Sequence, residues 1–380
     1  MKTRSIRTAA LVGLAAGCAV FAGCRSAAPK ARDEAVSRSL AKSFGFSGRR
    51  LAIDLGQTGP VRLRASSARL DGPYLVLVEE PNRVQAIDRN DLMPAWVYDG
   101  LPGDLRYPPS RTAISFLVMS DDELHQLDLR YGHQRGGAIH FDLAPSAPHA
   151  GTAGTAYIPS WGGSRGQRTL RTLNLVTGHE GWGYRTPGDI RGGIVVGGEP
   201  PRQTVYFATD SGDVYGMPAV EAAARAPEAS WVTRTHGPVT ADLVVDEGYL
   251  FVSSQDGFLY CMDRITGGVR WAAPHETPLL ASASATKGSV YQARAGEVWA
   301  HDRATGAVRW KAKAGRFVAE REGKTILAAE DGSLMSINAA GEVVGTMPSG
   351  GFYYPTNVDD GTLYAISGDG FIYKLEVGGE

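Results

Sequence analysis

Two stretches of the sequence decide the fold: residues 249–271 read YLFVSSQDGFLYCMDRITGGVRW, and residues 290–310 read VYQARAGEVWAHDRATGAVRW. Each begins with an alternating apolar strand, makes a tight turn and returns along a second alternating strand. An Asp-x-x-Thr-Gly turn follows in both, and a further strand then carries a tryptophan. The pattern predicts a unit of antiparallel strands that is repeated along the chain.

The repeat can be followed through the chain from Asp263, which ends the second alternating strand of the first stretch. We call this position the marker, and its eight copies are Asp88, Asp128, Asn174, Pro218, Asp263, Asp302, Asn338 and Glu376. The copies are 36 to 46 residues apart, the length of a four-stranded propeller blade. The sequence therefore predicts an all-β fold, an eight-bladed β-propeller of four-stranded antiparallel blades.

The hairpin turn six residues before each marker tests this alignment independently. These positions hold Asn82, Asp122, Gly212, Gly257, Gly296, Gly332 and Gly370, and only the third copy differs, with Arg168. Glycine, asparagine and aspartate tolerate the positive φ that tight hairpins require. We expect the five glycines to be structural turn residues.

Four tryptophans stand eight residues after a marker: Trp96, Trp182, Trp271 and Trp310. A large flat side chain on an outer strand can bury roughly 150 to 250 Å² across the gap between neighbouring blades. We expect these residues to dock one blade on the next, which is a structural role.

These motifs resemble the PQQ-like β-propeller repeat family, whose blades carry the pattern Asp-x-x-Thr-Gly-x-x-x-Trp. The segments 263–271 and 302–310 match it fully, and 174–182 matches with asparagine in place of aspartate. The resemblance covers about residues 65 to 380, and it implies a fold more specifically than an activity.

The first 23 residues, MKTRSIRTAALVGLAAGCAVFAG, combine a positively charged start with a short apolar run and predict a bacterial signal peptide. The apolar run is about fourteen residues long, too short to span a bilayer. Ala22-Gly23-Cys24 resembles a lipobox, so we expect lipid attachment at Cys24, with Cys18 or ordinary cleavage as the alternatives.

The domains expected after the signal peptide are a flexible tether over residues 24–45 and the propeller over 46–380. The eighth copy stops four residues beyond its marker and so lacks an outer strand. We expect the segment LAIDL at 51–55, or next best 61–64, to pair with the last copy and close the ring.

The charge balance is nearly neutral, with 39 Lys and Arg against 40 Asp and Glu, which disfavours nucleic acid as a partner. A lipid cysteine ahead of one propeller resembles the BamB-type lipoproteins of the outer-membrane β-barrel assembly machinery. That resemblance implies a non-enzymatic scaffold on the periplasmic side of the outer membrane, monomeric outside its complex. It implies a protein partner at the membrane, with barrel-assembly components as candidates, and no cofactor.

Two other functions stay open, a propeller that binds a small molecule or glycan in its central funnel and a quinone-dependent dehydrogenase. Quinone-dependent dehydrogenases of the resembled family are longer chains, which carry a pair of adjacent cysteines and a calcium site. Here Cys261 is alone in the mature chain, and the eight histidines show no zinc-ligand spacing. We therefore predict no catalytic, cofactor-binding or metal-binding residues.

Three irregular segments remain. The insertion 159–168, PSWGGSRGQR, combines an aromatic residue with arginines and suits either partner contact or an ordinary loop. The alanine-rich segment 218–227 could form a short helix. Tyr353-Tyr354 we expect to be buried rather than exposed.

Overall fold

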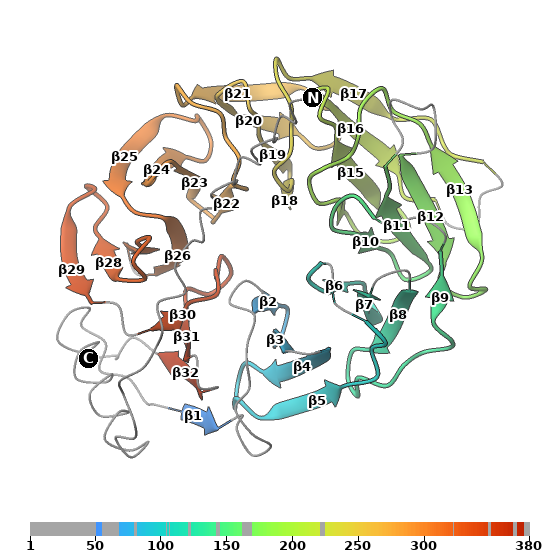
Figure 1. Cartoon of the computed structure of the whole chain (residues 1–380). Helices are drawn as coiled ribbons and strands as arrows, with labels where there is room; N and C mark the ends of the chain where they lie inside the picture. The colour runs from blue at the N-terminus through green and yellow to red at the C-terminus, as the bar shows by residue number, and fades with distance from the viewer. Residues whose placement is uncertain are drawn as a thin grey trace, which may run out of the picture.

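The computed structural model is a ring of eight four-stranded antiparallel sheets (Figure 1). It describes residues 51–54, 68–79, 82–103, 105, 107–120, 123–141, 145–161, 169–220, 225–321, 323–348, 351–367 and 371–375. The expected signal peptide, Cys24 and the tether lie outside these residues. Every regular element of the described chain is a strand, and no helix able to cross a membrane occurs there.

The first four blades follow the chain, and in each the strands run in order from the ring centre to its rim. Blade 1 contains β2 (Arg69–Asp71), β3 (Tyr74–Glu79), β4 (Arg83–Asp88) and β5 (Pro94–Tyr98). Blade 2 contains β6 (Ser110–Arg111), β7 (Ser115–Ser120), β8 (Glu123–Asp128) and β9 (Ile139–His140). Blade 3 contains β10 (Ala150–Gly151), β11 (Thr155–Pro159), β12 (Leu170–Asn174) and β13 (Glu180–Tyr184). Blade 4 contains β14 (Val195–Gly197), β15 (Thr204–Ala208), β16 (Asp213–Pro218) and β17 (Trp231–Arg234).

The second half of the ring repeats this arrangement until the last blade. Blade 5 contains β18 (Val244–Asp246), β19 (Tyr249–Ser253), β20 (Phe258–Asp263) and β21 (Val269–Pro274). Blade 6 contains β22 (Ser284–Ala285), β23 (Ser289–Arg294), β24 (Glu297–Asp302) and β25 (Val308–Lys313). Blade 7 contains β26 (Arg316–Arg321), β27 (Lys324–Ala328), β28 (Leu334–Ile337) and β29 (Val343–Met347). Blade 8 contains β30 (Phe352–Tyr353), β31 (Leu363–Ser367), β32 (Phe371–Leu375) and, as its outer strand, β1 (Leu51–Asp54).

In blades 1 to 6 the marker position ends the third strand, as at Asp263 in β20 and Asp302 in β24, and in blade 7 the marker Asn338 follows directly after β28. Their β-strands are buried on both faces: the burial pattern of β20 and β24 alike is four buried residues between two half-buried ones. A strand that is apolar on both faces needs a neighbouring sheet on each side. The eight-bladed fold predicted from the spacing of the markers is confirmed.

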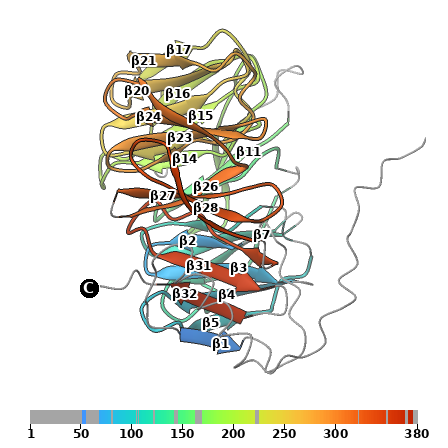
Figure 2. The ribbon, with the colours of Figure 1, turned by 90° about the vertical axis from the view of Figure 1, so that its left-hand side faces the viewer.

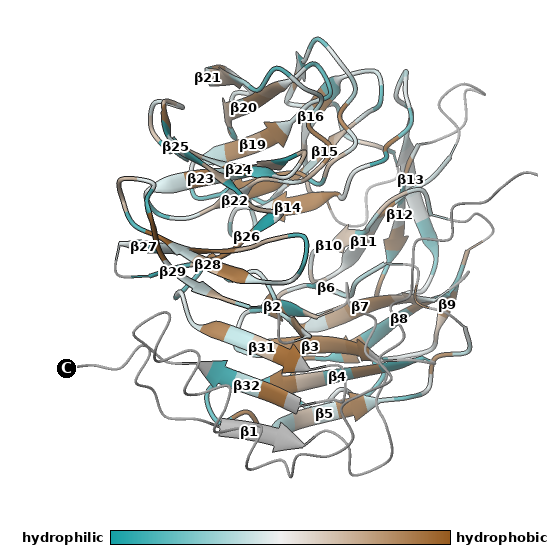
Figure 3. Ribbon diagram, turned by 60° about the vertical axis from the view of Figure 1, so that its left-hand side comes forward, coloured by the Kyte–Doolittle hydropathy of each residue, from teal (hydrophilic) through white to brown (hydrophobic). Residues whose placement is uncertain are grey.

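The hydrophobic core is divided among the seams, by which we mean the interfaces between neighbouring blades. One cluster of buried residues lies in each of the eight seams of the described chain. Between blades 7 and 8, for example, Val318 and Leu334 pack with Leu363 and Tyr373. Seen from the side the blades form a disk (Figure 2), and hydrophobic residues concentrate on middle strands such as β3, β7 and β19 (Figure 3).

The ring is closed by the pairing of its first and last strands. β1 lies antiparallel to β32, with Leu51 opposite Lys374 and Asp54 opposite Phe371. Blade 8 thereby gains a fourth strand from the beginning of the chain, and an open sheet edge is covered. The predicted closure by the segment at residues 51–55 is confirmed, and the second candidate at 61–64 lies outside the described residues.

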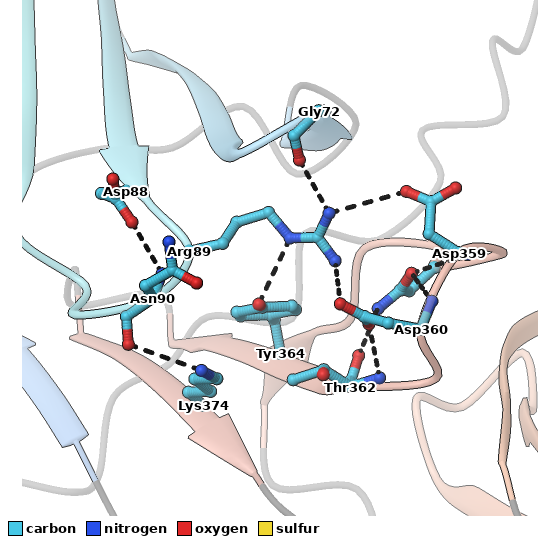
Figure 4. A network of polar contacts seen from close by, with 10 residues as sticks. Gly72, Asp88, Arg89, Asn90, Asp359, Asp360, Thr362, Tyr364 and Lys374 are labelled. Atoms are coloured by element: carbon cyan, nitrogen blue, oxygen red, sulfur yellow. Dashed lines mark hydrogen bonds and ion pairs between the residues drawn. The ribbon is translucent and has the colours of Figure 1, made fainter.

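A polar network joins blade 1 to blade 8, the last blade of the ring (Figure 4). The guanidinium of the buried Arg89 lies 2.8 Å from Asp360 Oδ2, 3.5 Å from Asp359 Oδ2, and donates to Gly72 O at 2.8 Å. Its Nε lies 3.3 Å from the hydroxyl of Tyr364. Because the carboxylates belong to blade 8 and Arg89 to blade 1, these contacts add side-chain bonds to a seam that no continuous sheet crosses.

Truncation at the N-terminus should separate the tether from the closing strand. A chain that begins at residue 46 retains β1, and we expect it to melt like the full chain. A chain that begins at residue 59 loses β1, and the lost strand hydrogen bonds should cost of the order of 3 kcal/mol. Thermal melts followed by circular dichroism measure the difference. Equal melting temperatures for the two truncations would contradict a closing role for β1.

Candidate interaction surface

The glycines expected at hairpin turns have left-handed backbone conformations where the structure describes them. The φ values of Gly212, Gly257, Gly296 and Gly332 are +90°, +84°, +77° and +78°, and Gly370 lies outside the described residues. At Gly257 the nearest atom to an added Cβ would be 3.4 Å away, so there is room for a side chain. The requirement for glycine there comes from the backbone conformation rather than from crowding.

The tryptophans expected between blades each lie on a turn of the next blade. Trp271 of blade 5 donates its Nε1–H to Arg303 O of blade 6 at 3.0 Å, and a Cβ on Gly306 would lie 2.7 Å from its ring. Trp96 donates in the same way to Leu129 O at 2.9 Å, and Trp182 donates to Val220 O at 3.4 Å. Trp310 covers Gly341, where a Cβ would lie 2.5 Å away. A glycine three or four residues after the marker, Gly341 in blade 7 and Gly306 in blade 6, thus leaves space for the tryptophan of the preceding blade.

A fifth docking tryptophan, Trp231 of blade 4, is missing from the sequence-based set. It donates to Arg264 O at 3.2 Å and covers Gly267 of blade 5. Trp231 stands thirteen residues after the marker Pro218 instead of eight, because the alanine-rich insertion separates β16 from β17. Counting backwards from the next blade would have located it. Residues 221–224 of that insertion lie outside the described residues, so the expected short helix stays a prediction.

Two residues singled out in the sequence lie in the core. Cys261 is fully buried, and burial raises the pKa of its thiol to about 12, so it stays protonated and cannot act as a nucleophile at neutral pH. Tyr354 is 1% exposed and belongs to the cluster between blades 7 and 8. Tyr353 is half-buried, with the guanidinium of Arg316 5.1 Å from its ring centroid.

Two fully buried histidines face each other between blades 5 and 6. His275 Nε2 lies 3.1 Å from His301 Nε2, and His301 Nδ1 lies 3.0 Å from Gly306 O. A carbonyl oxygen only accepts, so His301 carries its proton on Nδ1 and must accept at Nε2 from His275. Nδ1 of His275 is then an unprotonated buried nitrogen without a partner in the described chain.

The surroundings of this pair favour its neutral form. Burial, followed by the charges of His301, Arg294 and Lys311, lowers the pKa of His275 to about 3. The pKa of His301 is also lowered, first by burial. Among the described residues, no group of three or more His, Cys, Asp or Glu side chains is placed to hold a metal ion.

The start of the insertion at 159–168 places an aromatic side chain on the surface of blade 3. Trp161 is 46% exposed, and the guanidinium of Arg191 lies 5.0 Å from its ring centroid. Arg191 Nε donates to Asp210 at 2.7 Å, and Asp189 lies 3.8 Å from the same guanidinium. We call these four residues the Trp161 cluster. Residues 162–168 of the insertion lie outside the described residues.

The Trp161 cluster is built on connections that leave the same end of blades 3 and 4. Asp210 accepts from the backbone N–H of Asp189 at 2.9 Å, and the N–H of Asp210 donates to Asp189 O at 2.9 Å. These bonds fix Arg191, and Arg191 in turn stacks on Trp161. An exposed aromatic ring and arginine held in a rigid frame are the residue types most enriched at protein interfaces.

The buried histidines should make stability fall in mild acid. Because the folded pKa of His275 is lowered from 6.5 to about 3, the unfolded chain binds a proton below pH 6.5 that the folded chain excludes. We expect His275→Gln to reduce the loss of unfolding free energy between pH 6 and 5 by about 1 kcal/mol. Denaturant titrations at both pH values measure it.

A second buried histidine offers a matched variant. His149, between blades 2 and 3, has a pKa lowered by burial to about 4, and its Nε2 lies 3.0 Å from Leu117 O. His149→Gln should give an effect of the same sign, and the two effects should add because the sites occupy different seams. An unchanged pH dependence in both variants would refute the assignment of neutral buried histidines.

Comparison with known proteins supports the same fold. The family described as outer membrane protein assembly factor BamB matches residues 151–312 and 266–378, together more than half of the chain. The crystal structure of BamB from Moraxella catarrhalis is similar, with a TM-score of 0.65, 17% sequence identity, and coverage of 88% of this chain and 99% of that one. The computationally designed Ika8 protein gives a TM-score of 0.60 at 11% identity, with coverage of 85% and 98%. No curated protein sequence matches the chain.

The solved structures are less than 25% identical to this chain and show likeness of fold alone, whereas the family match is one of sequence. Repeat, fold and family match agree. The chain belongs to the BamB family of PQQ-like β-propeller proteins.

Proposed function

We propose that this protein is a non-enzymatic scaffold that binds a protein partner during the assembly of outer-membrane proteins. The observation that carries the proposal is the family match over residues 151–378, since that family is described as an outer-membrane protein assembly factor. The buried, protonated thiol of Cys261 gives no support to redox or nucleophilic chemistry. A rigid ring with variable loops suits a role in positioning.

The proposed location follows from the sequence of the N-terminus. Acylation of Cys24 would hold the propeller at the periplasmic side of the outer membrane, with residues 24–45 as the tether. One chain-terminal anchor leaves both faces of the disk free to meet a partner. The lipid then raises the local concentration of the scaffold near membrane-bound partners.

The surface that we propose for the partner is the Trp161 cluster. Its aromatic ring is partly exposed but already ordered by Arg191, so less side-chain entropy is lost when a partner covers it. The carboxylates of Asp210 and Asp189 hold the same guanidinium, at 2.7 Å and 3.8 Å. Burial of such a ring and its guanidinium at the centre of an interface is the common arrangement of an interaction hot spot.

Capture from solubilised envelopes tests both the partner and the surface. We expect the wild-type protein to recover barrel-assembly components, and Trp161→Ala/Arg191→Ala to lose most of them, because a hot-spot pair is worth about 2 kcal/mol or more. Immunoblots or mass spectrometry of the eluates measure recovery. Melting curves must first show that the variant is folded.

The chain supplies a closely matched control. Arg130 lies 5.3 Å from the ring of Tyr131, which is 57% exposed, so this is a second exposed arginine–aromatic pair. It occupies the turn after β8, at the opposite end of the blades from Trp161. Arg130→Ala/Tyr131→Ala should retain the partner. Failure of the wild-type protein to recover any assembly component would overturn the proposed function, and equal recovery by both double variants would overturn the proposed surface.

A further inference from the structure

A cleft of about 630 Å³ opens between blades 4 and 5, at the end of the blades where Asp263 and the other markers lie. Arg264, Trp231 and the segment 198–202 line it. Arg264 follows the marker Asp263 directly, just as Arg89 follows Asp88 and Arg303 follows Asp302. Three blades therefore place an arginine at the same position of the repeat.

In two of these seams the arginine is neutralised by the preceding blade. Arg303 Nη1 of blade 6 lies 2.6 Å from Asp246 Oδ2 of blade 5 and donates to Thr286 O at 2.7 Å. Arg89 of blade 1 makes the equivalent contacts to Asp360 of blade 8 and to Gly72 O. In both seams the arginine thus pairs with an aspartate that the preceding blade places at the end of its first strand or in the connection to its second.

The seam between blades 4 and 5 lacks that aspartate. Asp246 ends the first strand of blade 5 and pairs with Tyr249, and the residue at the same register position of blade 4 is Gly197, paired with Thr204. No hydrogen bond or ion pair reaches the guanidinium of Arg264 from the described residues, and its Nε is buried without a partner. The guanidinium of Arg264 therefore faces a cleft, whereas the equivalent arginines in the other two seams face a carboxylate.

The remaining walls of the cleft fit a short stretch of polypeptide. Pro200, Pro201 and the ring of Trp231 are apolar, and Ile265 at the edge is 74% exposed. Among the charged lining residues, Arg202 and Arg264 outnumber Glu199. The backbone of Gly198, with φ +90°, lies close enough that a Cβ there would stand 3.4 Å from Arg264 Nη1. The wall next to the guanidinium is therefore bare backbone.

We propose that this cleft binds an acidic peptide segment of a partner protein, whose aspartate or glutamate carboxylate pairs with Arg264 as Asp246 pairs with Arg303. The site goes beyond the proposed function, because it lies at the opposite end of the blades from the Trp161 cluster. Its recognition of an acidic peptide does not depend on the partner being a barrel-assembly component. A carboxylate that arrives on a peptide replaces the missing internal one. The apolar walls receive its flanking residues, and charge-assisted hydrogen bonds to the guanidinium select the acidic side chain.

The chain itself supplies the sequence of a test peptide, since residues 244–249, VVDEGY, carry the aspartate that pairs with Arg303 in the seam between blades 5 and 6. A capped peptide of this sequence should bind the purified full-length protein, and the VVNQGY peptide should bind at least about tenfold more weakly. Titrations followed by saturation-transfer NMR at low ionic strength measure both. Equal binding of the two peptides, or no binding of either, would overturn the proposal. If acetate binds at the same site with the same affinity as the VVDEGY peptide, the site recognises a small carboxylate and the proposal of a peptide ligand is wrong.

Substitutions separate the site from the stability of the fold. Arg264→Gln should abolish the preference for the acidic peptide while leaving the melting temperature nearly unchanged, because its guanidinium has no protein partner to lose. Arg264→Lys should keep part of the preference, and Glu199→Gln should strengthen it by removing the opposing charge. Arg303→Gln, the matched control, should lower the melting temperature and leave peptide binding intact. A preference that survives Arg264→Gln would refute the site.

Discussion

Each blade of this ring has two apolar faces and can bury them only against its two neighbours. The buried clusters lie between sheets, as at Val318 and Leu363, and every blade takes part in two of them. Loss of one seam therefore exposes two faces at once, and a partly built ring has no stable end. This is why the chain must bring its first strand to its last sheet, and why β1, only four residues long, closes the whole structure.

The seams are held by two kinds of contact that use the same residue. In the seams that follow blades 4 and 5, a tryptophan donates to the backbone oxygen of the arginine after the marker, Arg264 or Arg303. The side chain of that arginine then points back toward the preceding blade, where Arg303 meets Asp246. One contact depends on the backbone and the other on the side chain, so they can change independently during the divergence of the repeats.

Much of this architecture could be predicted from the sequence because it rests on local backbone chemistry. Positive φ at a hairpin restricts the turn to a few residue types, so Gly212 and Gly332 reveal the register even where the rest of the copy is degenerate. The spacing of eight residues from marker to tryptophan located the four docking tryptophans of blades in which the connection between the third and fourth strands is short. It failed at Trp231, because an insertion lengthened the turn before β17 and moved the tryptophan away from its expected position.

Contacts between blades were beyond the reach of the sequence for a different reason. The pairing of Arg89 with Asp360 joins residues 271 positions apart, and only the closure of the ring brings them together. The same holds for His275 and His301, which carry no ligand spacing and meet only across a seam. The Trp161 cluster likewise joins connections of two blades. Repeat patterns describe what recurs within each blade, whereas the candidate sites arise where neighbouring copies differ.

The residue after the marker shows how such a difference can arise without loss of the fold. In blade 2 this position is Leu129, which has no charge, yet its backbone oxygen still accepts from Trp96. In blade 5 it is Arg264, whose backbone oxygen accepts from Trp231 while its guanidinium lacks an internal carboxylate. In blade 5 this backbone contact and the apolar cluster hold the seam, so the seam does not depend on an ion pair of the Arg264 side chain. The seam between blades 4 and 5 thus differs from its neighbour in two ways, with Gly197 at the register position of Asp246 and a longer connection before the second strand, while the apolar clusters still hold both seams.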